Sequence, residues 1–243
     1  MEGVSLVIPV YNEEKFVAKA IESCLDQTVK PKEIIVIDDG STDKTPDIVR
    51  DFMYRYDKIV YIRNSKNMGI GYSRWRGVKD ASGDYIAFCS ADDALCPNFI
   101  EVMLEYSKKY PDSILYSDYY MCDENLKVIG TFKAPEFRSY EDFVIRVISE
   151  AKRHTMFVCY NIFSPSNILK KYNFDPEKRF GEDLEHLLRC VLVHKVKFAH
   201  VPVPLFYYRT HPMTTTSRRI KDIPANNLKT FEKINRLLGR KVL

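Results

Sequence analysis

The sequence lacks the signature loops of several large enzyme classes. It contains no G-x-x-x-x-G-K-[ST] loop, no G-x-G-x-x-G loop and no G-x-S-x-G elbow. P-loop phosphate binding, dinucleotide binding and serine hydrolysis therefore lose their usual signatures. The six cysteines include no C-x-x-C pair, and most of them lie within apolar patterns. We therefore expect buried free thiols in a reducing cytoplasm, in preference to disulfides or a zinc site.

Long apolar runs are also absent. No stretch approaches the ~20 apolar residues that a membrane-spanning helix needs. We expect no signal peptide, because Glu2 precedes an apolar run, Val4–Val10, that is too short. The formal net charge of +4 is mild, and we expect no nucleic-acid partner. At 243 residues the chain suits one large domain.

Two apolar runs each lead into a pair of aspartates. Ile34–Ile37 is followed by Asp38-Asp39, and Tyr85–Cys89 leads through Ser90-Ala91 to Asp92-Asp93. Strands buried on both faces read as continuous apolar runs, and open α/β sheets bind ligands beyond the carboxyl ends of such strands. Four carboxylates at one sheet edge repel one another unless they are solvated, hydrogen-bonded or bridged by a cation. The pattern predicts a site for a polar, metal-chelated ligand.

The first half of the chain alternates strands with helices. We expect strands at Val4–Val10, Ile34–Ile37, Ile59–Ile62 and Tyr85–Cys89. Four helices are expected between and after them: one capped by Asn12, one capped by Thr42 or Asp43, one at Tyr72–Ala81, and one from Pro97 to about Lys109. This order requires right-handed crossovers and a mainly parallel sheet, so the predicted fold class is α/β.

The second half is less regular. We expect strands at Ile114–Tyr116, Val128–Phe132, Phe157–Ser164, Val196–Val201 and Leu205–Tyr208, and helices at Tyr140–Ser149 and Glu182–Leu192. The tail Asn226–Leu243 places apolar residues along one face and basic residues around the rest, which predicts a basic amphipathic helix. This helix either packs on the core or lies on an anionic membrane surface.

Each acidic cluster has a structural interpretation beside the functional one. A strand-to-helix turn explains Gly40 and one capping residue, but not two carboxylates at the strand end, so Asp38-Asp39 is a candidate contact for a nucleotide base or ribose. Asp92-Asp93 could cap the helix opened by Pro97, but lies several residues before it. Magnesium and manganese bind through one or two carboxylates plus substrate phosphates, a role that this pair fits.

Two polar segments near the C-terminus are further candidates. Glu182-Asp183 either compensates a helix dipole or supplies a carboxylate that deprotonates a hydroxyl nucleophile. Arg209 and His211 are either solvated loop residues or lie beside a metal–diphosphate, where the arginine would neutralise leaving-group charge.

The motifs together resemble family 2 of the glycosyltransferases. The resemblance rests on Val4–Glu14, Ile34–Ser41, Gly83–Asp93 and Gly181–Asp183 in this order, and extends to Tyr208–His211. It implies a GT-A fold with a Rossmann-like nucleotide-sugar-binding half (residues 1–110), an acceptor-binding half (111–225) and the basic C-terminal helix (226–243). It also implies a divalent metal, Mn²⁺ or Mg²⁺, and transfer with inversion at the anomeric carbon.

The resemblance also implies roles for single residues. The implied nucleotide-sugar-binding residues are Pro9, Tyr11, Glu13, Asp38, Asp39, Arg74, Asp92, Arg209 and His211. Asp92 and Asp93 fall in the metal-binding motif, and Asp183 matches the general base. The chain departs from the family pattern at Ser90, where an aspartate is common, and at Trp75, where an asparagine is frequent.

We therefore expect an inverting, metal-dependent transfer of sugar from a nucleoside-diphosphate sugar to a hydroxyl of a glycan or lipid-linked acceptor, in glycan or polysaccharide biosynthesis. The resemblance favours uridine diphosphate as the nucleotide. A non-catalytic sugar-nucleotide-binding scaffold is one alternative, suggested by Ser90 but opposed by the retention of Glu182-Asp183. A sugar nucleotidyltransferase is another, but it needs a glycine-rich basic loop after the first strand, which Pro9–Asn12 does not offer.

Overall fold

The computed structural model describes residues 2–137, 139–153, 161–212, 214 and 221–239. Over these residues a nine-stranded sheet has the order β3-β2-β1-β4-β8-β6-β9-β5, with β7 paired to β6. The strands are β1 (Val4–Val10), β2 (Glu33–Asp38), β3 (Ile59–Arg63), β4 (Tyr85–Phe88), β5 (Ala94–Leu95), β6 (Ser113–Cys122), β7 (Val128–Phe132), β8 (Phe163–Pro165) and β9 (Lys197–Arg209). The helices are α1 (Val17–Leu25), α2 (Thr45–Arg55), α3 (Ile70–Asp80), α4 (Phe99–Lys109), α5 (Tyr140–Arg153), α6 (Ser166–Lys171), α7 (Glu182–Leu188), which continues as a π-helical turn η1 (Arg189–Val193), and α9 (Ile223–Leu238).

The predicted α/β class is confirmed, and the sheet is mainly parallel around β1. This strand pairs in parallel with β2 and β4, and β2 pairs in parallel with β3. Antiparallel strands then extend the sheet, because β8 pairs with β4 and β6 in the opposite direction. The carboxyl ends of β1, β2 and β4 consequently meet at one edge, where ligands bind in open α/β sheets.

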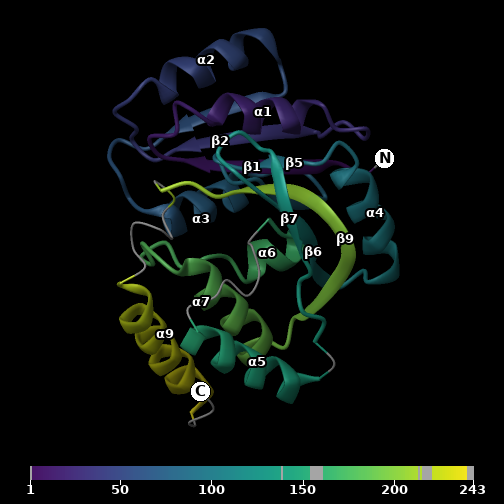
Figure 1. The fold of residues 1–243 in the computed structure, drawn as a ribbon, viewed down its shortest axis with the longest axis vertical. Helices are drawn as coiled ribbons and strands as arrows, with labels where there is room; N and C mark the ends of the chain where they lie inside the picture. The colour runs from purple at the N-terminus through teal and green to yellow at the C-terminus, as the bar shows by residue number, and fades with distance from the viewer. Residues whose placement is uncertain (1, 138, 154–160, 213, 215–220, 240–243) are drawn as a thin grey trace.

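Helices cover both faces of the sheet (Figure 1). Helices α1 and α2 lie over one face, and α3, α6 and α7 lie under the other, with α5 and α9 beyond them. Alternate residues of a strand point to opposite faces: Leu6 and Ile8 of β1 join the core under α1, whereas Val7 joins the core on the side of α3. Two buried cores explain the continuous apolar runs of β1 and β2.

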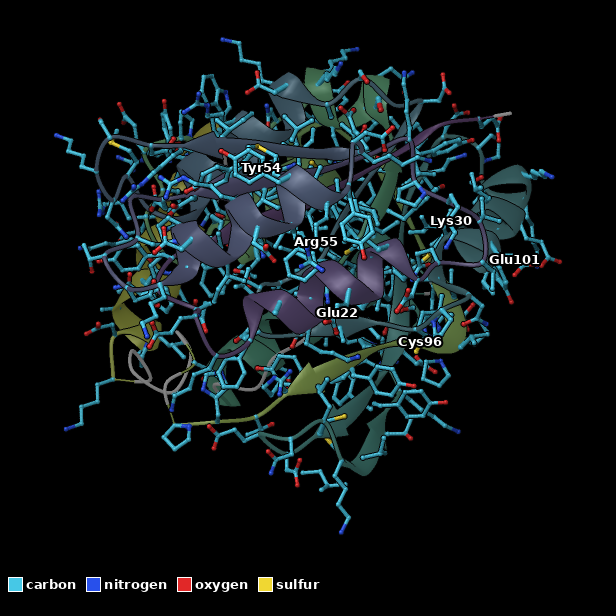
Figure 2. The ribbon with its side chains drawn as sticks, turned by 90° about the horizontal axis from the view of Figure 1, so that it is seen from above. Glu22, Lys30, Tyr54, Arg55, Cys96 and Glu101 are labelled. Carbon is cyan, nitrogen blue, oxygen red and sulfur yellow. The ribbon has the colours of Figure 1, made fainter. Side chains whose placement is uncertain are left out.

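The outer surface of the first helical layer faces solvent. Figure 2, which looks down on α1 and α2, places Tyr54 on the outside of α2, and this side chain is 81% exposed. The thiols on described residues are all free and buried, at positions Cys24, Cys89, Cys96, Cys122 and Cys190, as the sequence predicted. Cys159 lies outside the described residues. No described helix is long and apolar enough to cross a bilayer.

The predicted helix start at Asn12 is wrong, because α1 begins at Val17. Asn12 takes a positive φ of 55°, and its side-chain oxygen accepts a hydrogen bond from the backbone N–H of Thr42. The backbone N–H of Glu13 donates to Thr45 Oγ1. Residues 12–14 are therefore tied to the loop before α2, and this tertiary contact outweighs the capping preference of asparagine.

In the second half the strands are joined differently from the prediction. Val196–Val201 and Leu205–Tyr208 form one continuous strand, β9, whose pairing with β6 shifts register near Asp118 and so accommodates Pro202 and Pro204. Of the strand predicted at Phe157–Ser164, the first four residues lie outside the described part, Asn161 and Ile162 are not in a strand, and the last two belong to β8, Phe163–Pro165. The short elements β5 and α6 were not predicted, because two and six residues are too few for a periodic pattern.

The C-terminal helix packs on the core. Helix α9 begins at Ile223 and ends at Leu238, with Gly239 at a positive φ of 64° after it. Ile234 is fully buried, and Phe231 and Leu238 pack against the core on the side of α3. Of the two interpretations of this helix, the structure supports core packing for its apolar side.

Candidate active site

Two loops at the carboxyl edge of the sheet, residues 11–14 after β1 and residues 39–44 after β2, are hydrogen-bonded to each other. The backbone N–H of Asn12 donates to Ser41 Oγ over 3.0 Å, and the carboxylate of Glu14 accepts from the backbone N–H of Lys44. Of the predicted pocket residues, Pro9 is buried within β1, Glu13 is partly exposed, and Tyr11 is 41% exposed at the rim. Tyr11 thus offers an aromatic ring to a ligand at this edge.

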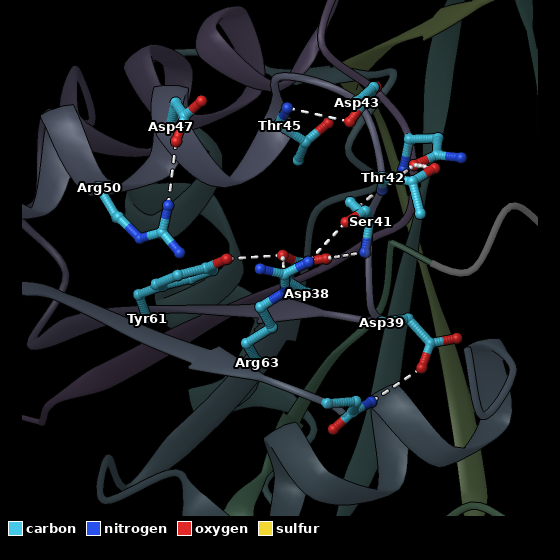
Figure 3. A network of polar contacts seen from close by, with 12 residues as sticks. Asp38, Asp39, Ser41, Thr42, Asp43, Thr45, Asp47, Arg50, Tyr61 and Arg63 are labelled. Carbon is cyan, nitrogen blue, oxygen red and sulfur yellow. Dashed lines mark hydrogen bonds and ion pairs between the residues drawn. The ribbon is translucent and has the colours of Figure 1, made fainter. Parts of the chain in front are cut away.

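Asp38 is the last residue of β2 and is fully buried (Figure 3). Its carboxylate accepts hydrogen bonds from the backbone N–H of Ser41 (2.8 Å) and from the Tyr61 hydroxyl (2.6 Å). Arg63 Nε lies 3.4 Å away. Burial and the hydrogen bond to Asp38 raise the pKa of Tyr61, so this hydroxyl stays a donor at neutral pH. Any nucleoside contact of Asp38 stays a prediction.

Asp39 holds the loop that leads into α3. One carboxylate oxygen accepts from Asn64 Nδ2 (2.8 Å) and from the backbone N–H of Met68 (2.9 Å), and the other accepts from the backbone N–H of Gly69 (2.8 Å). The Asp39 side chain is buried, and Figure 3 draws its hydrogen bond to the Asn64 amide as a dashed line. Asp39 therefore fixes the backbone of residues 68–69 beside the predicted nucleotide pocket, and its contact with a base or ribose stays a prediction.

Asp92 and His211 face each other across the end of the sheet. Nε2 of His211 lies 3.4 Å from Oδ2 of Asp92, and the Asp92 side chain is 23% exposed. The imidazole packs against the ring of Phe16, with centroids 4.6 Å apart. Of this pair only Asp92 is partly exposed, because the His211 side chain is 2% exposed, so a ligand would reach the pair from the side of Asp92.

Asp93 differs from Asp92, because its carboxylate faces the protein. It is buried and accepts from the backbone N–H of Arg209 (3.0 Å) and from Asn161 Nδ2 (3.3 Å). Asn161 also accepts from the Ser90 hydroxyl over 3.3 Å. Burial and the neighbouring charge of Asp92 raise the pKa of Asp93 well above its usual range. Asp93 thus joins the end of β4 to the end of β9.

Arg209 lies at the same junction. Its Nε donates to the backbone oxygen of Asp92 over 2.6 Å, and its Nη1 donates to the backbone oxygen of Glu124. The guanidinium stacks over the ring of Phe16 at 4.4 Å. Burial lowers the pKa of Arg209 from its ordinary value. The arginine positions Asp92 through its backbone and brings positive charge to the predicted diphosphate site.

Helix α7 begins with Glu182 and Asp183. Glu182 is buried, and its Oε1 lies 2.8 Å from Nη1 of Arg74 in α3. Burial, partly offset by Arg74, raises the pKa of Glu182 to about 7. Asp183 is partly exposed and accepts a hydrogen bond from the backbone N–H of Leu184. Of this acidic pair, Asp183 is the carboxylate that can meet a substrate.

These contacts place the start of α7 near the carboxyl edge of the sheet. The Arg74 guanidinium lies over the ring of Phe88 at 5.6 Å, and Phe88 is the last residue of β4. Since Arg74 pairs with Glu182, the helix that carries Asp183 begins beside the strand that leads to Asp92. The structure therefore brings the predicted base and the predicted metal motif to one end of the molecule.

The sequence did not single out two residues of this site. Asn161 bridges Ser90 and Asp93, and Phe16 supports both Arg209 and His211. The apolar pattern after Asn12 indicates only a core position for Phe16. Asn161 carried no signal, because a single amide between apolar residues has no characteristic spacing.

The donor set can be compared with the needs of a metal ion. No group of three or more His, Cys, Asp or Glu side chains converges on one point in the described part of the chain. A pair of donors, such as Asp92 with His211, fits a metal ion that completes its coordination with substrate phosphates and water. The residues present thus suit a cation that is bound together with a diphosphate, rather than a preformed metal cage.

Comparison with known proteins identifies the family. The model of "Glycosyl transferase family 2" matches residues 5–172, which is more than half of the chain. An uncharacterized glycosyltransferase of Methanocaldococcus jannaschii is 31% identical over 221 residues, which cover 90% of this chain and 74% of the relative. The glycosyltransferase EpsH of Bacillus subtilis is 26% identical over 95% of this chain and 67% of its own length.

The fold is also found in solved structures. S. aureus TarS 1-349 in complex with UDP-GlcNAc superimposes with a TM-score of 0.73 at 19% identity, covering 99% of this chain and 68% of that one. The chain spans 39% of the longer TarS structure, with a TM-score of 0.68. The motifs at the sheet edge, the family match and the shared fold agree, and the chain belongs to glycosyl transferase family 2.

Proposed function

We propose that this glycosyltransferase moves a sugar from a uridine-diphosphate sugar to an acceptor hydroxyl, with inversion at the anomeric carbon, in glycan or polysaccharide biosynthesis. The observation that carries the proposal is the approach of the Asp183 helix to the end of β4, through Arg74 and Phe88. The structural similarity to TarS, which was solved with UDP-GlcNAc, supports a uridine nucleotide as the donor.

Asp183 serves as the general base in this proposal. It is the partly exposed member of the Glu182-Asp183 pair, whereas its neighbour Glu182 is buried in an ion pair with Arg74. The carboxylate takes the proton from the acceptor hydroxyl as the oxygen attacks the anomeric carbon. Attack from the face opposite the diphosphate inverts that carbon through an oxocarbenium-like transition state.

The leaving diphosphate lies beside Asp92, Arg209 and His211. Asp92 and His211 would hold Mn²⁺ or Mg²⁺, and Asp93 would support them by fixing the Arg209 backbone. The ion supplies positive charge that stabilises the departing diphosphate. Arg209 contributes a second positive charge at the same edge while it holds the Asp92 backbone. Ser90, in place of the usual aspartate, leaves Asp92 as the exposed carboxylate of the motif.

The nucleoside would occupy the edge beyond β1 and β2. Tyr11 offers a ring at the rim, and Asp38 and Asp39 fix the surrounding loops through Ser41, Met68 and Gly69. A glycan or lipid-linked acceptor would approach from the side of α7.

A donor screen tests the proposal. Sugar nucleotides with uracil, guanine, adenine and thymine bases are added with and without Mn²⁺, and the midpoint of thermal unfolding is measured, because a ligand that binds the native state raises it. We expect a uridine-diphosphate sugar with Mn²⁺ to raise the thermal midpoint most. The selected donor is then incubated with a panel of acceptors, and we expect release of UDP. Binding without any turnover would favour the scaffold alternative. Retention of the donor's anomeric configuration in the product, measured by proton NMR, would contradict inversion.

Peripheral membrane contact is a separate proposal that rests on α9. Lys229 and Arg236 are exposed on this helix, as are Leu228 and Leu237, whereas Phe231, Ile234 and Leu238 pack on the core. Each Lys or Arg held near an anionic membrane surface contributes about 1 kcal/mol to the binding free energy. Flotation with phosphatidylserine vesicles should recover the protein, and Lys229→Glu/Arg236→Glu should reduce that recovery. Equal flotation of both proteins, or of neither, would contradict the contact.

A further inference from the structure

A buried ion pair connects the donor-binding half of the molecule to the helix of the catalytic base. Nη1 of Arg74, on α3, lies 2.8 Å from Oε1 of Glu182, and both side chains are only 6% exposed. The guanidinium lies over two aromatic rings, Phe88 and Phe174, at 5.6 Å each. An arginine between two rings and a carboxylate has its position fixed on several sides.

The acidic end of this pair adjoins Asp183 in the chain. Glu182 is the first residue of α7 and follows Gly181, whose φ is +66°. A Cβ at Gly181 would meet Asn226 of α9, so the chain is closely packed where it enters the helix. Because Glu182 and Asp183 are consecutive, a displacement of the Glu182 backbone moves Asp183 with it. Displacements near 1 Å can reduce catalytic rates on the order of a hundredfold.

The pair is poorly explained by stability alone. Replacing a buried ion pair by apolar residues of similar volume is often neutral or stabilising. Burial also raises the pKa of Glu182, which shows that the site disfavours the charge that Arg74 compensates. Besides Arg74, the charged groups that act on Glu182 are Asp183 on its own helix and Lys178 in the preceding segment.

We propose that Arg74 is a positioning residue, which acts through Glu182 to hold Asp183 in line with the donor site. The proposal rests on the proposed function, in which Asp183 is the base. It assigns Arg74 an indirect role in the reaction: the guanidinium supports the helix of the base instead of contacting the nucleotide. The donor-binding half thereby sets the position of a residue contributed by the acceptor-binding half.

The same helix offers a matched control one turn further on. Glu185 is fully buried and pairs with Lys233 of α9 (2.8 Å) and with Arg189 (2.9 Å). Lys233→Met therefore removes a cation from a buried carboxylate of α7, and from Asp175, with which Lys233 also pairs at 2.6 Å, while Arg74 and Glu182 keep each other. Such a change should lower stability while leaving Asp183 in place.

The test compares four variants with the wild-type protein. Arg74→Met removes the cation, Arg74→Lys keeps it, Glu182→Gln neutralises its partner at constant size, and Lys233→Met is the control. The readouts are kcat and KM for UDP release from the donor that the screen selects, the dissociation constant of UDP by calorimetry, and the thermal midpoint. Glu182→Gln keeps the test open if Arg74→Met does not fold, because the glutamine oxygen can still accept a hydrogen bond from the guanidinium.

We expect Arg74→Met and Glu182→Gln to lower kcat on the order of ten- to a hundredfold, with donor KM and UDP affinity within about threefold of wild type. Arg74→Lys should recover much of kcat, and Lys233→Met should lower the thermal midpoint with kcat nearly unchanged. Wild-type kcat in Arg74→Met and Glu182→Gln would overturn the proposal. So would a loss of UDP affinity in parallel with kcat, which would make Arg74 a donor contact, or an equal loss of kcat in Lys233→Met. Absence of turnover in the wild-type protein would contradict the proposed function itself.

Discussion

Nε2 of His211 lies 3.4 Å from Oδ2 of Asp92, although the two residues come from opposite halves of the chain. His211 follows β9, and Asp92 follows β4. Arg209 and Asp93 join these two segments through the Arg209 backbone N–H and the Asp93 carboxylate. The pairing of donors therefore depends on the junction of two strand ends, and it supplies the proposed metal site.

Asp92→Asn should weaken Mn²⁺ binding in the presence of UDP by at least about tenfold. The amide keeps the size of the side chain but removes the negative charge that a hard cation prefers. Calorimetric titration of Mn²⁺ into the UDP complex measures the change. Asp47→Asn is the control, because the Asp47 side chain is 78% exposed and pairs with Arg50 within α2. Equal Mn²⁺ affinity in the two variants would remove Asp92 from the metal site.

The stability of the fold should fall with decreasing pH because of His186. This histidine of α7 is fully buried, stacks on Phe174 at 4.2 Å and hydrogen-bonds the backbone oxygen of Tyr172. Burial lowers its pKa to about 3, whereas the unfolded chain binds the proton near 6.5. The contribution of the neutral His186 ring to the free energy of unfolding is therefore complete above pH 6.5, and it is lost as the pH falls from 6.5 towards 3.

The slope of this loss is about 1.4 kcal/mol per pH unit for one proton. Urea unfolding at several pH values between 7.5 and 4.5 should show it in the wild-type protein. His186→Gln keeps a hydrogen-bond donor near the Tyr172 carbonyl. It should reduce the slope of the unfolding free energy against pH by about 1.4 kcal/mol per pH unit, while the other titrating groups contribute as before. An unchanged slope in the variant would mean that His186 is protonated in the native state.

Helix α3, which carries Arg74, has no space for a side chain at Gly71. A Cβ at Gly71 would lie 2.2 Å from the backbone oxygen of Lys178 and 2.8 Å from that of Asp175. Gly71→Ala should therefore lower the free energy of unfolding by about 1–3 kcal/mol, the usual cost of overpacking. Gly239→Ala meets nothing within 4 Å and carries only the cost of its positive φ, about 1–2 kcal/mol.

The two glycine variants are separated by their effect on catalysis. Gly71→Ala pushes α3 away from the segment that leads to α7, and should lower kcat as well as stability. Gly239 ends α9 at the surface, so its variant should keep kcat. Chemical denaturation and UDP-release assays on the same samples make the comparison. Full activity in Gly71→Ala would show that the contact between α3 and residues 175–178 does not influence the site.

The parallel half of the fold was predictable because its signals are local. Strands β1 and β2 are mostly apolar, since both faces are covered, and the alternation with helices predicts a parallel sheet. The helix start at Asn12 was not predictable, because Ser41 and Thr45 draw the loop away from the helical path. Local capping preference carries no information about such long-range partners.

The sequence singles out candidate residues for the site but does not reveal the contacts between them. The sequence singled out Asp92, His211 and Asp183 by their places beside expected elements. It gave no indication that Glu182 pairs with Arg74, because the partners come from helices far apart in the chain. The burial of Asp93, in contrast to Asp92, likewise depends on Asn161 and on the end of β9.

The most direct test of the account is the turnover of Asp183→Asn. UDP release from a saturating uridine-diphosphate sugar, with Mn²⁺ and an acceptor, is compared with the wild-type protein and with Glu177→Gln, an exposed control in the preceding segment. The account predicts a loss in kcat on the order of 10²- to 10⁴-fold in Asp183→Asn, with unchanged UDP affinity and normal turnover in the control. Wild-type turnover in Asp183→Asn would contradict its role as the base.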